Sequence, residues 1–318
     1  MIIIKKVLVI GSLNMDFVVE VDNMPLPGQT ILGNSFNLVP GGKGANQAYA
    51  LGKLGTDVSI IGVIGNDQYG SILLNNLKSV DVNTNSVIKL ENVDTGCAFI
   101  NVDKNGENSI VVISGANKRI TKEMINKNIH KIEEADIIVM QLEISLEIVT
   151  YIAKLAKKMN KIVILDPAPA ITNLPEDLLK NIDIIKPNET EIEIISGIKT
   201  INNDNIISAA KKLIEKGVNN VIVTLGERGS VLVNKENIKF FDAIKVNVVD
   251  TTAAGDCFTA GLTKALIEGK DIDEAIKFGH IVSSIAVTKK GAQTSIPDQK
   301  EIQVFINKLE EINEKNNY

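Results

Sequence analysis

The residues with the most distinctive chemistry lie in the sequence DTTAAGD, from Asp250 to Asp256. Ala253, Ala254 and Gly255 stand where a helical repeat of apolar residues begins. The first amides of a helix lack internal partners and carry the positive end of its dipole, which suits an anion such as phosphate. A carboxylate beside that anion, here Asp256, suits a base that takes a proton from an attacking hydroxyl. In isolation, a capping Asp250 and a dipole-stabilising Asp256 explain the same seven residues.

Further polar groups follow the first predicted strand, which covers 7–10. Asn14 and Asp16 are separated by one residue and can bind adjacent hydroxyls of a sugar, although Asx turns are the commoner use of such residues. The sequence PGGKGAN then leads into a predicted helix, and its glycines let the backbone approach a ligand. It contains the candidates Gly42, Lys43 and Asn46. No stretch matches GxxxxGK[ST], and no GxGxxG follows a strand, so neither a P-loop nor a dinucleotide site is supported.

The remaining candidates follow other predicted strands, so we expect them at one edge of a sheet. They are Glu143, Asn188, Glu191, Thr224 and Asp250. Asn188 and Glu191 lie three apart at a helix start, where their oxygens suit hydrated magnesium near phosphates or, equally, an ordinary helix N-terminus. The segment TLGERG is predicted to join two strands by a turn along a nucleotide, and hairpin geometry explains it nearly as well.

The elements that must position these residues alternate between strand and helix. Strands are predicted at 7–10, 58–63, 137–142, 162–165, 182–185, 221–225 and 245–249. Helices are predicted around 72–77 and at 122–133, 146–158, 205–216, 272–288 and from 300 onward. This order predicts an α/β fold: a doubly wound, mainly parallel sheet flanked by helices. A small antiparallel flap is predicted from strands at 17–21, 31–39, 95–102 and 109–114, with a hairpin turn at Asn105 and Gly106.

Composition narrows the class of protein. The chain has 318 residues, 44% hydrophobic and 23% charged, with a net charge of -5 and only 4% aromatic residues. It can bury a large core, but it lacks the basic excess and the stacking residues that nucleic-acid binding needs. Cys97 and Cys257 have no ligand spacing, so we expect reduced packing residues. The N-terminal apolar run is too short for a signal peptide or membrane helix, which predicts no membrane association and a cytoplasmic location.

Seven motifs, spread in order over almost the whole chain, resemble those of the ribokinase family of carbohydrate kinases. They are GSLNMD, PGGKGANQA, QLE, KPNETE, TLGERG, DTTAAGD and AVTKKGAQTSIP. The resemblance implies one α/β domain over 1–318 with a small β-sheet lid, formed by about 14–40 and 95–114, and a homodimer made through the lids. It also implies phosphoryl transfer from ATP, with Mg²⁺, to the 5-hydroxyl of D-ribose. One departure is Asp166 in DPAPA, where similar kinases often carry Asn.

The resemblance also implies a role for each candidate residue. The sugar is expected to contact Asn14, Asp16, Gly42, Lys43, Asn46, Glu143 and Asp256. The nucleotide is expected to contact Asn188, Thr224, Gly226, Gly229, Gly255 and His280, with Asn188 and Glu191 near magnesium. Asp256 is implied as the catalytic base, with an anion hole formed by Ala253, Ala254 and Gly255. A potassium site is implied at Asp250, Thr252, Ala286, Lys289, Gly291 and Ser295.

Two alternatives stay open at this point. One is a kinase of the same family that acts on deoxyribose, fructose or a nucleoside. Asn14, Asp16 and Lys43 favour a free sugar, because a nucleoside needs an apolar or aromatic slot for its base. The other is a sugar- or nucleotide-binding regulator without catalysis. The carboxylate of Asp256 argues against it, since a pure binder of anions gains nothing from a negative charge beside its anion site.

Overall fold

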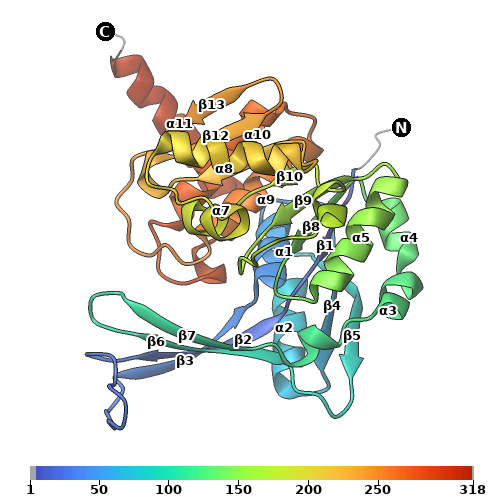
Figure 1. The fold of residues 1–318 in the computed structure, drawn as a ribbon. Helices are drawn as coiled ribbons and strands as arrows, with labels where there is room; N and C mark the ends of the chain where they lie inside the picture. The colour runs from blue at the N-terminus through green and yellow to red at the C-terminus, as the bar shows by residue number, and fades with distance from the viewer. Residues whose placement is uncertain (1–4, 317–318) are drawn as a thin grey trace.

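The computed structural model describes residues 5–316 and arranges nine strands of that range in one large sheet (Figure 1). The strand order is β13-β12-β11-β10-β9-β8-β1-β4-β5. The seven strands from β11 to β5 are parallel, and β12 and β13 run antiparallel at one edge. The bounds are β1 (Val7–Ile10), β4 (Val58–Gly65), β5 (Asn83–Leu90), β8 (Ile137–Gln141), β9 (Ile162–Asp166), β10 (Ile184–Ile185), β11 (Asn220–Thr224), β12 (Ser230–Asn234) and β13 (Ile238–Phe241). The predicted fold class is confirmed.

Helices cover both faces of this sheet, because alternate residues of its central strands enter two separate apolar cores. In β1, Leu8 and Ile10 pack into one core, whereas Val7 and Val9 pack into the other. The first core is covered by α3 (Lys122–Lys127), α4 (Ile129–Glu134), α5 (Leu146–Lys158), α6 (Glu176–Leu179), α7 (Glu189–Ser196) and α8 (Asn203–Glu215). The second is covered by α1 (Lys43–Lys53), α2 (Gln68–Lys78), α9 (Ala254–Ile267), α10 (Ile272–Ala286) and α11 (Gln299–Asn316).

A second, four-stranded sheet lies apart from the large one, at the bottom of Figure 1. Its order is β3-β2-β6-β7, with the bounds β2 (Asn14–Glu20), β3 (Ser35–Gly41), β6 (Gly96–Val102) and β7 (Asn108–Ile113). The strands β6 and β7 form the predicted hairpin: Gly106 has a φ of 81°, and the Asn105 amide donates to the Asp103 carboxylate. This small sheet matches the predicted flap, except that β2 and β6 are parallel.

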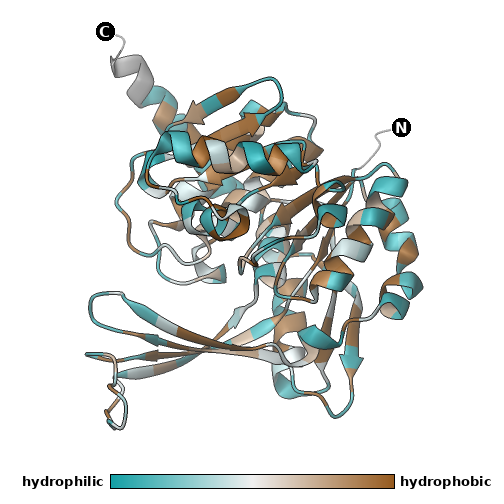
Figure 2. Ribbon diagram, in the orientation of Figure 1, coloured by the Kyte–Doolittle hydropathy of each residue, from teal (hydrophilic) through white to brown (hydrophobic). Residues whose placement is uncertain are grey.

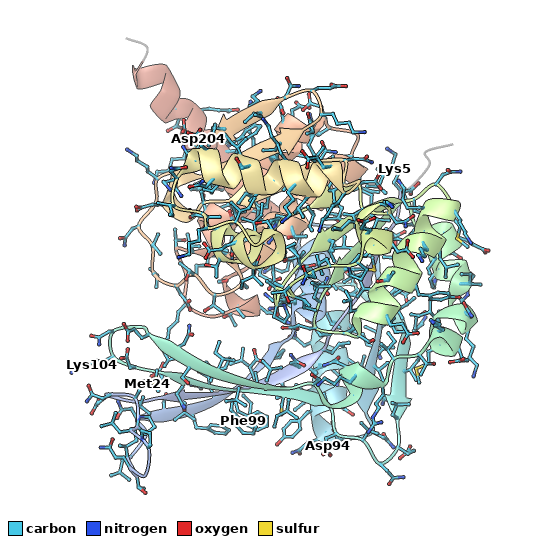
Figure 3. The ribbon with its side chains drawn as sticks, viewed as in Figure 1. Lys5, Met24, Asp94, Phe99, Lys104 and Asp204 are labelled. Carbon is cyan, nitrogen blue, oxygen red and sulfur yellow. The ribbon has the colours of Figure 1, made fainter. Side chains whose placement is uncertain are left out.

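The two faces of the small sheet differ in chemistry, because successive side chains of a strand point to opposite sides. Asn14 and Asp16 share one face of β2. The opposite face carries Phe17, which is paired in register with Leu38 and Phe99 and stacks on the Phe99 ring at 5.0 Å between centroids. Phe99 lies on the side directed away from the large sheet (Figure 3), and apolar residues recur along these strands (Figure 2). We call this apolar side, formed by Phe17, Phe36, Leu38, Phe99 and Val111, the outer face.

The prediction of a strand at 245–249 is wrong. The strand β13 ends at Phe241, and residues 242–250 continue as an irregular segment that belongs to neither sheet. Lys245, Val246 and Val248 line a cleft, so the segment borders that cleft instead of pairing in a sheet, although its sequence alternates between polar and apolar residues. Asp250 therefore follows an irregular segment and not a strand.

Two other local predictions also need correction. The helix predicted over 122–133 is divided at Asn128 into α3 and α4, because the Asn128 side-chain amide donates to the Met124 carbonyl and ends the first helix. The strand predicted over 31–39 begins only at Ser35. Both errors concern where an element starts or stops, and these points depend on local hydrogen bonds that apolar periodicity does not report.

Two expectations about the chain as a whole concern cysteine and membranes. Cys97 and Cys257 are both free thiols, and Cys257 is buried in the second core, as predicted for packing residues. Across residues 5–316, no helix is both long enough and apolar enough to cross a membrane.

Candidate active site

A cleft of about 1260 Å³ opens at the carboxyl edge of the large sheet. The residues that line it come from the ends of β9, β10 and β11 and from α1, α7, α9 and α10. The lining includes the predicted residues Lys43, Asn188, Glu191, Thr224, Gly226, Gly229, Ala253, Ala254, Gly255, Asp256 and His280. The fold therefore brings together the predicted base, anion hole and nucleotide residues at one edge, as the sheet topology requires.

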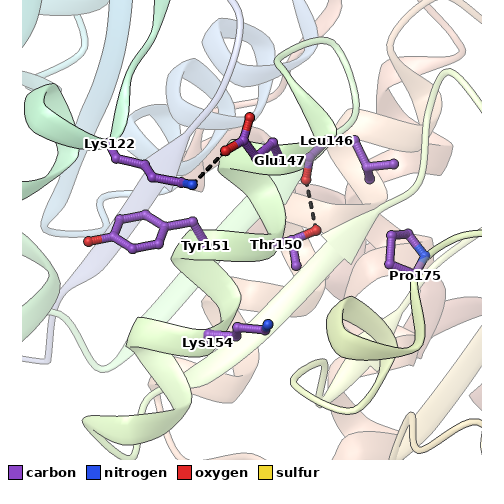
Figure 4. A pocket seen from close by; sticks show the side chains of 7 residues that line it. All are labelled: Lys122, Leu146, Glu147, Thr150, Tyr151, Lys154 and Pro175. Atoms are coloured by element: carbon purple, nitrogen blue, oxygen red, sulfur yellow. Dashed lines mark hydrogen bonds and ion pairs between the residues drawn. The ribbon is translucent and has the colours of Figure 1, made fainter.

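A smaller cavity of about 330 Å³ lies on the surface beside α5 (Figure 4). Its lining consists of Lys122, Leu146, Glu147, Thr150, Tyr151, Lys154 and Pro175. Each of its two lysines is paired with a carboxylate, Lys122 with Glu147 and Lys154 with Asp177. None of the predicted site residues lines this cavity, so the large cleft is the candidate active site.

The predicted anion hole has the backbone geometry of an open helix N-terminus. Ala253 caps α9 in the left-handed conformation, with φ 60° and ψ 10°, which is a strained position for a residue other than glycine. The Ala254 amide donates to the Thr251 carbonyl, and the Cys257 amide to the Ala253 carbonyl. Within the described chain, the backbone amides of Gly255 and Asp256 have no hydrogen-bond acceptor. An anion at this point would receive hydrogen bonds from the amides of Gly255 and Asp256, whereas the amide of Ala254, predicted as part of the anion hole, is already bonded to the Thr251 carbonyl.

Asp256 is buried in the first turn of α9, and its side chain is held by two amides from α1. Asn46 Nδ2 donates to Oδ2 at 3.0 Å, and Gln47 Nε2 donates to Oδ1 at 2.9 Å. Burial raises the pKa of Asp256, the positive charge of Lys43 opposes that shift, and the negative charge of Asp166 adds to it. The result is an oriented carboxylate with an elevated pKa, which is the property expected of a general base near neutral pH.

The predicted sugar residues Asn14 and Asp16 lie against the glycine pair at the start of α1. A Cβ atom at Gly41 would lie 2.1 Å from Asp16 Oδ2, and one at Gly42 would lie 2.7 Å from the Asn14 amide nitrogen. Gly42 also has a φ of 86°, which favours glycine. The sequence suggested that these glycines admit a ligand. In the structure they admit the β2 strand itself and bring its polar face to the beginning of α1.

Charged groups crowd the space between the small sheet and the cleft. Glu143, which follows β8, accepts a hydrogen bond from the Lys43 amide at 3.0 Å and another from the Ser12 hydroxyl. Burial, together with the negative charges of Glu143 and Asp256, raises the pKa of Asp16 to about 7. Burial also lowers the pKa of Lys43, but the surrounding carboxylates outweigh it and raise that pKa overall. The predicted sugar residues and the predicted base therefore belong to one electrostatic cluster.

On the nucleotide side, Asn188 and Thr224 are neighbours through a parallel β-bridge. Asn188 Oδ1 accepts from the Glu191 amide at 2.8 Å, and the Glu191 carboxylate accepts from the Asn188 amide at 2.9 Å. These two reciprocal hydrogen bonds form a capping box, so Asn188 and Glu191 do act as an ordinary helix N-terminus. Both side chains also line the cleft, and their role near magnesium stays a prediction. In the described chain, no three His, Cys, Asp or Glu side chains are grouped to hold a metal ion.

The turn between β11 and β12 and the helix α10 complete the nucleotide side. Gly226 and Gly229 bound this turn, with φ values of 59° and 90°, as expected of a glycine-bounded connection. His280 Nε2 lies 2.9 Å from the Ser230 hydroxyl, and the His280 ring meets Phe258 edge-on. Burial lowers the pKa of His280 to about 4, so its imidazole is neutral at physiological pH. A neutral ring in the lining suits contact with an uncharged part of a ligand.

The residues predicted to hold potassium come from two segments that the fold joins. Asp250 accepts hydrogen bonds from the Thr252 amide at 2.9 Å and from the Gly291 amide at 2.8 Å. Burial alone would raise the pKa of Asp250, but the hydrogen bond from the Thr252 hydroxyl at 2.6 Å and the two amide bonds lower it overall, so the carboxylate is ionised at neutral pH. The other predicted members are Ala286 at the end of α10 and, beyond it, Lys289 and Ser295. A carboxylate, carbonyls and a hydroxyl are ligands that a hard cation prefers, and the potassium site stays a prediction.

The sequence analysis missed three polar side chains close to Asp256. Gln47 follows Asn46 in α1, and Asp166 and Lys186 come at the carboxyl ends of β9 and β10. A usable signal was present, because a polar residue that ends a buried apolar strand, as in IVILD, resembles the positions of Glu143 and Thr224. Asp166 ends β9 as Thr224 ends β11, and Lys186 follows β10 as Glu143 follows β8, so the same pattern indicates both residues.

Comparison with known proteins identifies the class to which this fold and cleft belong. Residues 4–299 match the pfkB family of carbohydrate kinases, and the chain belongs to this family of phosphotransferases. It is 41% identical to a ribokinase of Haemophilus influenzae over 95% of this chain and 98% of the relative, and 36% identical to a deoxyribokinase of Salmonella typhi over 94% and 97%. The structure of Arabidopsis thaliana ribokinase complexed with ribose and ATP superimposes with a TM-score of 0.89 at 36% identity, covering 95% of this chain and 98% of the other.

The charge cluster around Asp16 predicts an unusual dependence of stability on pH. A carboxyl pKa of about 7 in the folded protein, against 3.8 normally, means that the folded state binds the proton more tightly than the unfolded state. Its contribution to stability is therefore complete below pH 3.8 and lost as the pH rises through 7. By pH 8, ionisation of Asp16 should lower the free energy of unfolding of the wild type by up to about 4 kcal/mol. Asp16→Asn has no carboxyl group to ionise, so we expect it to escape this decrease.

Urea unfolding of the wild type and Asp16→Asn at pH 5 and pH 8 measures this effect. The free energy of unfolding of the variant, relative to the wild type, should be higher at pH 8 than at pH 5. Asp57→Asn, at an exposed position, is the matched control. An Asp16→Asn difference that is the same at both pH values would show that Asp16 is not under this electrostatic stress.

Proposed function

We propose that the protein transfers the γ-phosphoryl group of ATP to the 5-hydroxyl of D-ribose. The observation that carries this proposal is the buried, amide-held Asp256 beside two unpartnered helix amides, in a cleft bordered by a polar cluster around Asp16. The likeness to ribokinases over nearly their full length, and to a ribokinase complexed with ribose and ATP, supports ribose as the acceptor.

In the proposed reaction, Asp256 accepts the proton of the 5-hydroxyl while the hydroxyl oxygen attacks the γ-phosphorus. The bond from the γ-phosphorus to the bridging oxygen breaks, and its electron pair leaves with ADP. The amides of Gly255 and Asp256 donate hydrogen bonds to the phosphoryl oxygens, and Ala253 and Ala254 shape the same turn. Asn46 and Gln47 keep one hydrogen bond on each carboxylate oxygen, so the base is already oriented before the sugar arrives.

Sugar contacts are proposed for Asn14, Asp16, Gly42, Lys43, Asn46 and Glu143. Nucleotide contacts are proposed for Asn188, Thr224, Gly226, Gly229, Gly255 and His280. Magnesium bound with ATP would neutralise phosphate charge, with Asn188 and Glu191 nearby. We further propose that residues 14–40 and 95–114 act as a lid over the sugar and that the enzyme is cytoplasmic, where ATP is available. Cell fractionation would test the location.

The acceptor is tested by measuring ADP release with D-ribose, 2-deoxy-D-ribose, D-fructose and adenosine. We expect the highest kcat/KM with D-ribose, and phosphorus NMR of the product should show a phosphate ester at the 5-position. A higher kcat/KM with 2-deoxy-D-ribose would support the second candidate, which the likeness to a deoxyribokinase favours. An absence of ADP release with every acceptor, in protein that binds ATP, would contradict catalysis and support a binding regulator.

The proposed base is tested by Asp256→Asn, which retains the shape of the side chain and removes its charge. We expect sugar binding to persist and kcat to fall by roughly 10² to 10⁴, the range for loss of a general base. Asp57→Asn, far along the sequence and exposed, controls for the exchange itself. Turnover close to that of the wild type would reduce Asp256 to a residue that stabilises the helix end.

Potassium is the proposed activating cation, held by Asp250, Thr252, Ala286, Lys289, Gly291 and Ser295. Thr252 immediately precedes the anion hole, so a cation bound there would stabilise the turn that carries its amides. We expect K⁺ to raise kcat and Na⁺ to substitute poorly, since ligands set for a larger ion do not close on a smaller one. Activity is measured in a tetramethylammonium buffer titrated with KCl, NaCl or CsCl at constant ionic strength. Full activity in protein that elemental analysis shows to be free of potassium would refute the proposal.

A homodimer through the small sheets is proposed from the outer face. Phe36, Leu38 and Phe99 are between 44% and 58% exposed and adjoin on one side of a sheet, and such an apolar patch marks an interaction site. Light scattering should give about twice the chain mass of 34.4 kDa, and Phe99→Glu should give monomers. Phe240→Glu, which alters an exposed phenylalanine on β13, is the matched control. A monomeric wild type at micromolar concentration would contradict this interface.

A further inference from the structure

A buried ion pair lies behind the anion hole and has no role in the mechanism above. Lys186 Nζ is 3.1 Å from Asp166 Oδ2, and the two side chains are only 4% and 2% exposed. Removing two charges from water costs several kcal/mol, and apolar residues in such a place are often equally stable or more stable. Stability alone therefore does not account for the pair, and its position at the floor of the cleft points to function.

Gln47 connects this ion pair to Asp256. Its Nε2 atom lies 2.9 Å from Asp166 Oδ2 and 2.9 Å from Asp256 Oδ1, so one amide group bridges two carboxylates. The orientation of that amide is fixed, because its Oε1 atom accepts a hydrogen bond from Gln141 Nε2 at 2.6 Å. Asp256 is thus attached to a network that runs through the carboxyl ends of β8 and β9.

Lys186 attaches the same network to the anion hole. Its Nζ atom donates to the Gly255 carbonyl at 3.3 Å, and a Cβ atom at Gly255 would lie only 3.2 Å from it. Asp166 Oδ1, the carboxylate oxygen turned away from these contacts, has no hydrogen-bond partner within the described chain. Its charge is therefore only partly compensated by Lys186, and some of it acts on the neighbouring Asp256.

We propose that Asp166, Lys186 and Gln47 are positioning residues that orient the Asp256 carboxylate and, through the partly compensated charge of Asp166, strengthen it as a base. This inference rests on the proposed role of Asp256. The charged groups that act on Asp256 are Lys43 from α1, Asp166 from β9 and Asp16 from β2. Beyond them, Lys186 after β10 is paired with Asp166, and Glu143 after β8 acts on Asp16 and Lys43. Among these, Asp166 adds to the elevation of the pKa of Asp256 and Lys43 opposes it.

The two partners of the ion pair should have opposite effects on the pH profile. Asp166→Asn removes a negative charge near Asp256, so the acid limb of the profile should move to lower pH by about one unit. Lys186→Met removes a positive charge and leaves Asp166 uncompensated, so the limb should move to higher pH by a similar amount. A loss of structural support alone would lower the rate without moving the limb in opposite directions.

The rate is measured by rapid quench at saturating sugar and ATP between pH 5 and pH 9. At saturating sugar and ATP the profile reports the ionisations of the complex, and the infrared titration described below assigns them to Asp256. Because Lys186→Met leaves a buried charge, the double variant Asp166→Asn/Lys186→Met is included as a neutral pair that is expected to fold. Its acid limb should lie between those of the two single variants and below that of the wild type, because the uncompensated part of the Asp166 charge is removed. An unmoved limb in Asp166→Asn, or shifts of the same sign in the two single variants, would overturn the proposal.

The test is independent of which sugar is the acceptor. The profile is recorded with whichever acceptor the wild type phosphorylates best. If ribose is not the acceptor, the same measurement with another sugar still tests the inference. The protonation of Asp256 can also be followed without turnover, from infrared difference spectra of each protein against the same protein carrying Asp256→Asn. In Asp166→Asn, the signal of the protonated carboxyl group should disappear at a lower pH than in the wild type. Identical titrations would overturn the proposal even if the catalytic rates differ.

Discussion

The burial of one carboxylate at the beginning of a helix is the constraint on which the rest of the site depends. Asp256 is 5% exposed and has no counter-ion in direct contact; its oxygens accept hydrogen bonds from the neutral amides of Asn46 and Gln47. A buried charge without hydrogen bonds would be very costly, so α1 and α9 must keep the relative position in which these amides reach Asp256. That relative position also fixes Lys43 and the glycines before it, and with them the position of the small sheet.

The parallel sheet supplies the polar groups that this buried charge requires. Each strand runs through an apolar interior and ends at the same edge, so Gln141, Asp166 and Lys186 meet there although they are far apart in sequence. The apolar residues just before them anchor these groups on rigid elements. The loops beyond the strands provide Glu143 and Asn188, and their helix caps and backbone amides satisfy the polar atoms that remain.

Much of the fold was predictable because the helices and central strands have strong local patterns. The helix at 146–158 is found as predicted, since its apolar stripe packs on one core. The strand β5 (Asn83–Leu90) was missed because NTNSVIKL begins with polar residues and is fixed by pairing with β4. The segment 245–249 gave the opposite error, a predicted strand that the structure does not contain. Residues that line a cleft can alternate between polar and apolar in sequence as those of a strand do.

In the candidate site, too, local features were predictable and long-range contacts were not. The turn at Ala253 to Gly255 and the carboxylate of Asp256 are local features of one heptapeptide, and the sequence was enough to single them out. The bridge from Gln47 to Asp166 joins residues more than a hundred positions apart, and its geometry depends on how α1 packs over the sheet. No local pattern reports such a contact. The sequence was therefore enough to propose which groups do the chemistry but not what holds them in place.

The strand β2 links two properties that usually vary separately in enzymes. Asp16 and Phe17 are adjacent, and they lie on opposite faces of the same strand, one against Gly41 in the charge cluster with Glu143 and one on the outer face. A shift of one residue in the pairing of β2 would exchange them, placing a phenylalanine beside the charge cluster and a carboxylate on the outer face. Insertions or deletions within this strand would therefore alter ligand contacts and surface chemistry together. During divergence, the strand is expected to resist any change in its length.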